Sequence, residues 1–376
     1  MTKKRRALII SFSDLSRDPR IYRQLCALQN SYEISAAGLH RPPDQLATGE
    51  FYDLNYKASP AWLRLALAIA LKLGFYDWAY WHLGKIRTAS KKLENVINVN
   101  YDLIIANDIE TLPLAVRIKG KARLFIDAHE YAPEEHYHSK VWRFFYHKFL
   151  MYLCNTYLKE ADRVFTVGPE IAKKYSTSFN VPVEVIMNCP FYEELTPTAV
   201  DANDVKIIHH GGAIRSRRLE LMIEAMEHTS TRFSLDFMLI PSDPTYLDEL
   251  KQKASSNPRI RFIPPVPMPE IARFCNNYDI GLYPLRPCNY NECYALPNKF
   301  FEFIQARLAI VVGPSPEMAS LVEKYALGKV AESFEATDIA KALDSMTISS
   351  IYQFKINSHN AAADLSAERQ LKALLF

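Results

Sequence analysis

A lysine and a glutamate stand three residues apart in a segment whose sequence is typical of the start of a helix. Residues 296–302 read Leu-Pro-Asn-Lys-Phe-Phe-Glu. Because proline suits the first turn of a helix, we expect Lys299 near the helix N-terminus and Glu302 on the same face, about 4.5 Å further along the axis. The helix dipole disfavours a cation at this end, and a bound anion would resolve the conflict. The segment therefore predicts that Lys299 holds a diphosphate and Glu302 accepts hydrogen bonds from ribose hydroxyls; the alternative is a Lys–Glu pair on the surface.

A glycine pair lies between a predicted strand and a predicted helix in the same half of the chain. Gly211 and Gly212 follow an apolar run, and a helical pattern opens at Leu219. Glycines in this position let backbone N–H groups approach an anion closely, and the helix N-terminus favours negative charge. Three arginines add positive charge to the segment: Arg215, Arg217 and Arg218. The pattern predicts a phosphate-binding turn, and the alternative is a tight turn with solvated arginines.

Polar side chains end two apolar runs in the first half. Asn107 and Asp108 end one run, and Asp127, His129 and Glu130 end the next. Paired carboxylates occur in glycosidases, but the diphosphate features favour group transfer over hydrolysis. If such a transfer inverted configuration, Asp127, His129 or Glu130 would be the candidate base. The alternative for His129 is a structural histidine.

Short apolar runs alternate with segments of helical length, which predicts βαβ units and two parallel sheets. The first series of strands is expected at Ala7–Phe12, Ile34–Ala37, Leu103–Ala106, Leu124–Asp127, Val164–Val167 and Val183–Ile186. The second is expected at Val205–His209, Ser234–Ile240, Ile260–Ile263, Ile280–Tyr283 and Ala309–Val312. The aperiodic stretch Asn188–Asp204 separates the two series. In such sheets ligands gather at the carboxyl ends of strands, where the polar residues above lie.

Composition excludes several other classes of protein. The 376 residues are 49% hydrophobic and 23% charged, unlike a disordered or fibrous chain, and the net charge of +3 is too even for a protein dedicated to nucleic acid. Six dispersed cysteines without Cys-x-x-Cys spacing indicate neither a zinc ribbon nor a disulfide framework. The apolar run after Arg6 is too short for a signal peptide, and no stretch offers the ~20 apolar residues of a spanning helix. We expect a cytoplasmic protein.

The segment over residues 60–92 is basic and aromatic. It holds six Lys or Arg, one acid and three of the four tryptophans. In one continuous helix Arg64, Lys72 and His82 would share an arc surrounded by apolar surface. This favours a helix lying among the headgroups of an anionic membrane, with residues 144–148 extending the surface; the alternative is a core helix with a polar stripe.

Several of these motifs resemble those of one family. They are His210-Gly-Gly with Arg217, residues 296–302, Val312-Gly-Pro-Ser-Pro-Glu317, Asn107-Asp108, Asp127-Ala-His-Glu130, residues 162–170 and Ser16-Arg-Asp-Pro-Arg20. The chain resembles the family 4-like glycosyltransferases of GT-B fold, a group that commonly builds bacterial capsule, exopolysaccharide and lipopolysaccharide. The resemblance implies an α/β chain of two Rossmann-like, doubly wound parallel-sheet domains facing a cleft. It covers most of the chain, and residues 296–302 are its most specific element.

The resemblance also implies roles for particular residues. The predicted donor-binding residues are Gly211, Gly212, Arg217, Pro297, Asn298, Lys299, Glu302 and Ser315, and the predicted catalytic residues are Asp127, His129, Arg217 and Lys299. Arg217 and Lys299 would contact the diphosphate, and His129 would lie near the donor sugar or the incoming hydroxyl. The chain departs from the family at Tyr294, where a second glutamate is common, and at Arg218 and Arg307, where glycine is common.

These implications extend to domains and partners. We expect an acceptor-binding domain over 1–190, a linker over 191–204, a nucleotide-sugar-binding domain over 205–351, and a C-terminal helix at about 352–376 packing back on the first domain. The donor would be a UDP- or GDP-sugar used as substrate, with no cofactor or metal, and transfer would retain configuration. The acceptor would be a polyprenyl-diphosphate-linked glycan or an oligosaccharide, at the inner face of the cell membrane. The alternatives are a nucleotide-sugar epimerase of GT-B fold and a non-catalytic, membrane-docked protein.

Overall fold

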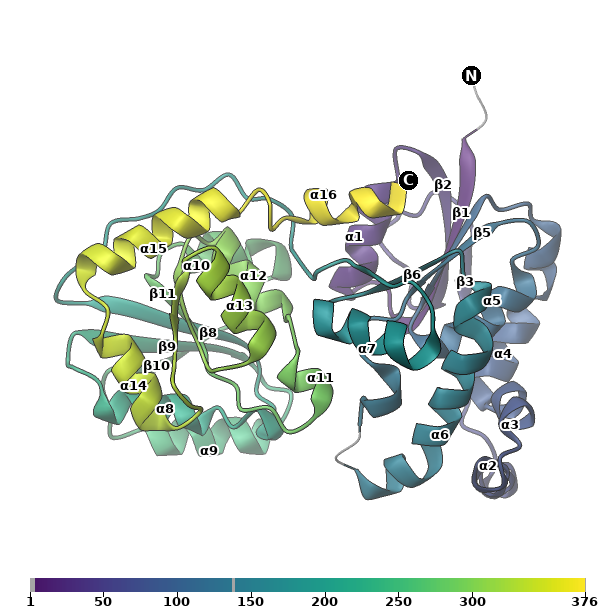
Figure 1. Cartoon of the computed structure of the whole chain (residues 1–376), viewed down its shortest axis with the longest axis horizontal. Helices are drawn as coiled ribbons and strands as arrows, with labels where there is room; N and C mark the ends of the chain where they lie inside the picture. Colours follow the sequence, from purple (N-terminus) through teal and green to yellow (C-terminus); the bar gives the residue numbers. More distant parts are fainter. Residues whose placement is uncertain (1–3, 137–138, 376) are drawn as a thin grey trace. The chain divides into compact units, whose positions relative to one another are not determined.

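The computed structural model describes residues 4–136 and 139–375. Contacts between residues divide the chain into two compact units (Figure 1). The first contains the chain up to Met187, together with Asn289–Asn291 and the last turn. The second contains Asn188–Cys288 and Glu292–Gln370.

A seven-stranded parallel sheet forms the centre of the first unit, in the order β3-β2-β1-β4-β5-β6-β7. Its strands are β1 (Arg5–Asp14), β2 (Tyr32–Leu39), β3 (Phe51–Asp53), β4 (Leu103–Asn107), β5 (Arg123–Asp127), β6 (Arg163–Thr166) and β7 (Glu184–Val185). Ala7 pairs with Leu103 and Ile10 with Ala106, so β1 and β4 lie side by side at the centre. The strand order reverses between these two strands, which is where ligands bind in doubly wound sheets.

Helices follow the strands of this sheet. They are α1 (Pro19–Leu28), α2 (Ala61–Leu73), α3 (Tyr76–His82), α4 (Gly84–Lys92), α5 (Leu112–Ile118), α6 (Lys140–Tyr157) and α7 (Pro169–Phe179). Helix α1 begins where the Asp18 carboxylate accepts the N–H of Arg20 at 2.9 Å, with Pro19 in the first turn. Helices α2, α3 and α6 pack together at one end of the unit (Figure 1).

The second unit contains a six-stranded parallel sheet in the order β10-β9-β8-β11-β12-β13. Its strands are β8 (Val205–Gly212), β9 (Phe233–Ile240), β10 (Ile260–Ile263), β11 (Ile280–Tyr283), β12 (Ala309–Val312) and β13 (Gly328–Val330). Its helices are α8 (Glu220–His228), α9 (Pro244–Ala254), α10 (Ile271–Cys275), α12 (Asn298–Gln305), α13 (Pro316–Lys324), α14 (Ala336–Asp344), α15 (Ile348–Ala361) and α16 (Ala367–Gln370), with α11 (Tyr290–Cys293) at the boundary of the units. Helices α8, α9 and α14 cover one face of this sheet, and α10, α12 and α15 lie on the other (Figure 1).

The two parallel α/β units confirm the predicted fold class, and every predicted strand is present. The sequence missed β3 and β13, which are three-residue edge strands too short to show a hydrophobic period. Residues 186–204, which include the expected linker, contain no helix or strand and belong to the second unit from Asn188 onward.

Two expected helices differ from the structure. The segment over 60–92 is not one helix: Gly74, at φ +84°, ends α2, so His82 lies on the separate helix α3, where it stacks on Trp78. The C-terminal stretch is also divided. Helices α15 and α16 belong to the second unit, and the last described turn, at Leu371–Leu375, contacts α1 in the first. Across the two described ranges, no helix combines the length and apolar character needed to cross a membrane.

Candidate functional site

The last two residues of β8, Gly211 and Gly212, and the residues that follow them up to Arg218 (the glycine turn) lie against the first turn of α12. Gly211 has φ +127°, and a Cβ added there would collide with Nζ of Lys299 and would lie 3.1 Å from its Cε. The same Cβ would lie 3.8 Å from Nη1 of Arg217. Three predicted donor-binding residues therefore meet at one point. Glycine is required there, because any side chain would fill the space beside the two cations.

Lys299 is a buried cation without a hydrogen-bond acceptor. Its side chain comes from the first turn of α12, after Pro297 at the N-cap, and the residue is only 7% exposed. Nζ lacks any hydrogen-bond partner and lies 4.9 Å from the centroid of the Tyr283 ring. Burial, and then the charge of Arg217, lower the pKa of Lys299 to about 7, although Glu302 opposes this shift. Because Lys299 is buried, the alternative that it forms a Lys–Glu pair on the surface is excluded. An anion beside Lys299 and Arg217 would stabilise both cations.

Glu302 lies one turn further along α12, beside His210. Its Oε2 atom is 3.4 Å from Nε2 of His210, and its side chain retains 14% exposure. Burial, followed by the charge of Lys299, lowers the pKa of His210 to about 3, so this imidazole is neutral. A carboxylate at the rim of a cationic pocket can accept hydrogen bonds from hydroxyl groups next to a bound phosphate.

Buried polar atoms without partners gather at the carboxyl end of the second sheet. Among the described residues, they include Nε2 of His209, Oδ1 of Asn298, Nζ of Lys299 and Oγ of Ser315. Asn298 begins α12, and Ser315 is the N-cap residue of α13 after β12. Since few buried polar groups in a folded protein lack partners, such a concentration at one sheet edge indicates a site for a polar ligand.

The three arginines of the glycine turn have different surroundings. Arg217 is half-buried beside Lys299, whereas Arg215 forms a bidentate ion pair with Glu249 at 2.6 and 2.8 Å. Arg218 is exposed and lies 3.6 Å from Glu220. Arg217 is thus the arginine that faces the anion site.

Arg218 and Arg307, which replace common glycines of the family, both have left-handed backbone conformations, at φ +49° and +61°. Arg307 is completely buried at the end of α12. It donates hydrogen bonds to the carbonyl oxygens of Gln305 and Leu195, at 2.7 and 3.2 Å, and to Nδ1 of His359 at 3.1 Å. Arg307 therefore acts on helix packing, joining α12 to residues 193–195 and to α15.

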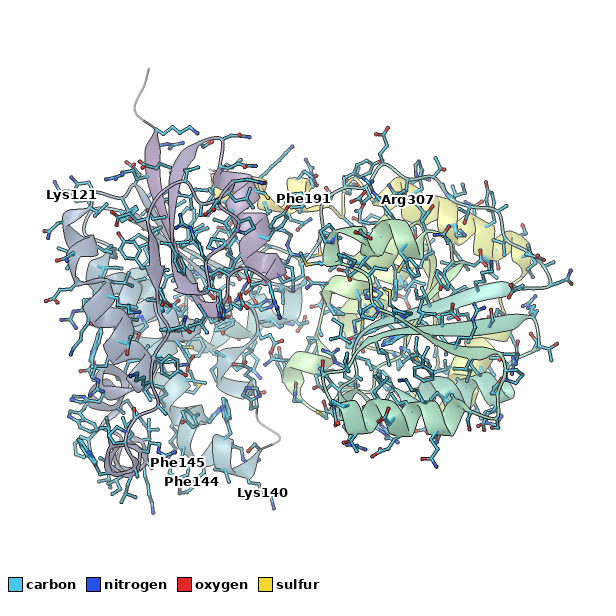
Figure 2. The ribbon with its side chains drawn as sticks, turned by 180° about the vertical axis from the view of Figure 1, so that it is seen from behind. Lys121, Lys140, Phe144, Phe145, Phe191 and Arg307 are labelled. Atoms are coloured by element: carbon cyan, nitrogen blue, oxygen red, sulfur yellow. The ribbon has the colours of Figure 1, made fainter. Side chains whose placement is uncertain are left out.

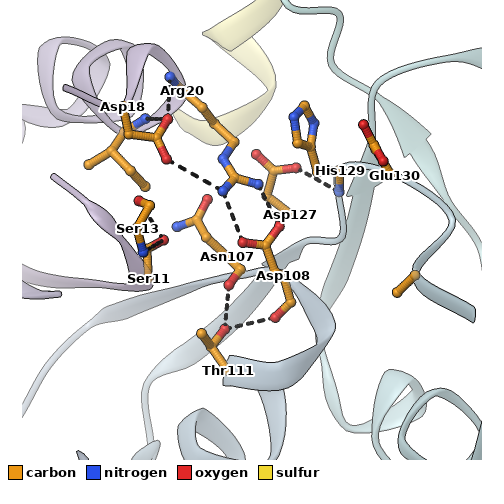
Figure 3. Close-up of polar contacts among 12 residues, drawn as sticks. Ser11, Ser13, Asp18, Arg20, Asn107, Asp108, Thr111, Asp127, His129 and Glu130 are labelled. Atoms are coloured by element: carbon orange, nitrogen blue, oxygen red, sulfur yellow. Dashed lines mark hydrogen bonds and ion pairs between the residues drawn. The ribbon is translucent and has the colours of Figure 1, made fainter. Parts of the chain in front are cut away.

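In the first unit, a partly buried polar network surrounds the ends of β4 and β5 (Figure 3). Arg20 donates two hydrogen bonds to Asp108, at 2.8 and 3.0 Å. Gln24 donates to Oδ2 of Asp127 at 3.0 Å, and Oδ1 of Asp127 accepts the N–H of His129 at 3.2 Å. Burial raises the pKa of Asp127. The carboxylate of Asp127 thus holds the turn that carries His129. Asp127 was predicted to be catalytic, but it does not line the pocket described next.

A pocket of about 560 Å³ opens beside this network. Its lining includes Arg20, Asp108, His129, Glu130, Glu135 and Trp142. His129 has φ +57°, and burial, followed by the charge of Arg20, lowers its pKa to about 4. Its Nδ1 atom has no hydrogen-bond partner. A neutral imidazole at the pocket wall can exchange hydrogen bonds with a hydroxyl group.

Sequence reasoning missed part of this pocket. Glu135, Trp142 and Tyr146 line it, although no strand end identifies them. Trp142, Tyr146 and Leu150 recur every four residues along α6, so they share one face, and that spacing was the available signal.

The described residues contain no group of three or more His, Cys, Asp or Glu side chains arranged to hold a metal ion.

Part of the sequence matches a known protein family, and the whole fold is similar to solved structures. Residues 204–347 match the family described as "Glycosyl transferases group 1". No curated protein matches the sequence. Among solved structures, the chain is similar to α,α-trehalose 6-phosphate synthase from Burkholderia multivorans, at 12% identity and a TM-score of 0.66 over 99% of this chain and 98% of that one.

Two further structures are similar over nearly their whole length. The Anabaena protein HepE in complex with UDP-glucose has a TM-score of 0.70 at 12% identity, over 98% of this chain and 99% of that one. WaaG, a glycosyltransferase involved in lipopolysaccharide biosynthesis, has a TM-score of 0.64 at 10% identity, over 97% and 99%. The family match and the fold together identify a glycosyltransferase of the GT-B type.

Proposed function

We propose that this GT-B glycosyltransferase moves a sugar from a nucleotide-diphosphate-sugar to a growing, polyprenyl-diphosphate-linked glycan in the synthesis of a cell-surface polysaccharide. The observation that carries the donor assignment is the buried, unpartnered Lys299 beside Arg217 and Gly211, with Glu302 one turn away. The donor assignment is supported by the similar structure of HepE, which contains UDP-glucose. The role in a cell-surface polysaccharide is supported by the similar protein WaaG, which is involved in lipopolysaccharide biosynthesis.

The proposed reaction breaks the bond between the sugar C1 and the leaving phosphate and forms a bond between C1 and an acceptor oxygen. Negative charge develops on the phosphate, where Lys299, Arg217 and the N–H groups of the glycine turn stabilise it. In the retaining course that we favour, a phosphate oxygen takes the acceptor proton on the same face. His129 then contacts the donor sugar or the acceptor hydroxyl. Asp127 is a poor candidate base, because Gln24 and the N–H of His129 already occupy its oxygens.

Donor binding is tested directly by thermal unfolding in the presence of UDP-, GDP- and ADP-sugars. A ligand that binds only the native state stabilises it by about 2.7 kcal/mol at 100 times its dissociation constant, so we expect sugars of one base to raise Tm by several degrees. A transfer assay with that donor and a lipid-linked saccharide then follows, with the product anomer read by NMR. The donor incubated without acceptor is a control for epimerisation. Absence of a Tm shift with every nucleotide sugar would contradict the donor assignment.

Binding of a nucleotide sugar should weaken as pH rises above 7. In the free protein the pKa of Lys299 is about 7, and a bound diphosphate would raise it because the charged form gains a partner. Affinity is therefore full below pH 7 and falls by up to about tenfold per pH unit above it, until the pKa of the complex is reached. Calorimetry in buffers of different ionisation enthalpy would measure the proton taken up with the ligand. Lys299→Arg keeps its charge in this range and should lose the pH dependence; an unchanged profile would show that another group titrates.

A further inference from the structure

Helix α2 exposes an apolar stripe on the side opposite the face that it buries. The buried face consists of Leu63, Leu67, Ala70 and Leu71. The exposed stripe consists of Trp62, Leu65, Ile69 and Leu73, of which Trp62 is 70% and Leu65 64% exposed. At 100° per residue, the members of each set fall within one arc, and the two arcs face in opposite directions. A helix that is apolar on both sides is normally buried on both, so the exposed stripe lacks a partner.

Helix α6 extends this exposed surface. Val141 and Phe144 lie on its outer side, and Phe144 is 59% exposed. The Nζ atom of Lys72, from α2, lies 5.7 Å from the centroid of the Phe144 ring, so the two helices form one continuous surface. Phe75, directly after α2, is exposed as well. Figure 2 shows Lys140, Phe144 and Phe145 at the end of the first unit. We call the exposed sides of α2 and α6, with Phe75, the α2–α6 face.

Three exposed cations belong to the helices of the α2–α6 face, and Asp77, two residues after Phe75, is the one acid of residues 60–92. Arg64, Lys72 and Lys140 are exposed, and none of them forms a salt bridge with a described residue. Elsewhere in the same basic segment, Lys85 pairs with Glu110 and Lys92 lies 3.8 Å from Asp53, so these two cations are neutralised. Free cations remain next to the apolar stripe, and a complementary partner must offer both apolar volume and negative charge.

We propose that the α2–α6 face docks on the surface of an anionic lipid bilayer. Apolar side chains would enter the boundary between headgroups and acyl chains, and Trp62 would lie at the interface, where indole rings are favoured. Lys72 and Lys140 would face lipid phosphates, and Arg64, at the edge of the helix, would reach them with its long side chain. Helix α2 is about 20 Å long and would lie in the plane of the membrane rather than cross it.

Docking would also determine from which side a lipid-linked acceptor reaches the pocket of the first unit. This step rests on the proposed function. Trp142, Tyr146 and Leu150 line the pocket from the side of α6 opposite to Val141 and Phe144. One helix therefore separates the α2–α6 face from the pocket by its own width. A saccharide attached to a membrane lipid would reach the pocket around α6 while its lipid stays in the bilayer. This arrangement would hold the enzyme at the inner face of the cell membrane.

Cosedimentation with lipid vesicles tests the docking surface. We expect the full chain to bind vesicles containing phosphatidylglycerol, to bind phosphatidylcholine vesicles far more weakly, and to dissociate from the anionic vesicles as salt rises. The charge variant Arg64→Glu/Lys72→Glu should lose at least about tenfold in vesicle affinity, since each cation contributes about a factor of five. The apolar variant Trp62→Ser/Leu65→Ser/Ile69→Ser should lose binding at low salt too.

Matched controls change the same residue types elsewhere. Lys251→Glu on α9 and Ile97→Ser, both exposed and outside the α2–α6 face, should leave vesicle binding unchanged. Full binding by both surface variants would overturn the proposal, as would a dimer in sedimentation analysis that disappears in the apolar variant. Donor binding, measured by thermal shift without vesicles, should be normal in every variant. Loss of vesicle binding with a normal donor shift supports docking, and vesicle binding without any donor shift would contradict only the proposed function.

Discussion

Lys299→Ala should reduce sugar transfer by about 100- to 1,000-fold while leaving the fold intact. The substitution removes the buried cation beside the glycine turn, and removing one preorganised donor to a developing negative charge typically has an effect of this size. Stability should not fall greatly, because an ammonium group that is buried without an acceptor is unfavourable in the free protein. The measurements are kcat/KM with the nucleotide sugar found by thermal shift, and the Tm of each variant without ligand.

Two variants make this result specific. Lys324→Ala, on the exposed side of α13, removes a lysine outside the site and should leave kcat/KM unchanged. Glu302→Ala should also abolish transfer, but its loss should appear in binding of the nucleoside, because we assign this carboxylate to ribose hydroxyls. Unimpaired transfer in both Lys299→Ala and Glu302→Ala would show that the donor site lies elsewhere.

Much of the second unit's site was predictable because its signals are local in sequence. A lysine in the first turn of a helix conflicts with the helix dipole, and this conflict by itself indicates a bound anion. The structure explains the signal, since Lys299 is buried and has no acceptor. Gly211 was likewise identified by its place just before a helix, although the structure includes it in the end of β8. The sequence did not predict the contact between Gly211 and Lys299, because these residues are far apart in the chain and come together only when β8 pairs with β11 in the folded sheet.

The first unit was less predictable, because its site depends on side-chain directions at strand ends. Asp127 and His129 are two residues apart, yet one faces Gln24 and the other the pocket. His129 has a positive φ, which the alternation of side chains along a strand does not predict. The break in the basic segment had a local cause, Gly74, whose left-handed conformation ends α2. In a continuous helix Arg64, Lys72 and His82 would have shared one arc. In the structure, exposed apolar side chains dominate the outer side of α2.

The departures from the family at Arg218 and Arg307 show a related limit. Both residues occupy left-handed positions, which explains why glycine is common there. The sequence alone does not reveal what compensates the strain. For Arg307 the compensation is a set of hydrogen bonds to carbonyl groups at the end of α12, made by a fully buried guanidinium. The helix that presents Lys299 and Glu302 is thus fixed at its far end by a residue that motif matching would count as a mismatch.

Gly211→Ala should weaken donor binding by at least about tenfold, and far more than Gly212→Ala. At Gly211 the added Cβ meets Nζ of Lys299, and the backbone has φ +127°. The variant therefore both strains the backbone and displaces the Lys299 ammonium group. At Gly212 the added Cβ meets Oγ of Ser242 at 2.8 Å and the Ile214 side chain at 3.4 Å, and these can rotate away. Calorimetric titration with the nucleotide sugar compares the two variants.

A double-mutant cycle separates the clash from the strain. Backbone strain at Gly211 remains in the Lys299→Ala background, whereas the collision with Nζ disappears. Gly211→Ala should therefore lower Tm less in that background than in the natural sequence, and the difference measures the contact between the two residues. Equal losses in both backgrounds would mean that Lys299 does not lie against the turn, and equal affinities of Gly211→Ala and Gly212→Ala would exclude close approach of the ligand to Gly211. Because the proposed chemistry requires backbone N–H groups and a buried cation to converge on one phosphate, this contact is the geometric condition on which donor binding depends.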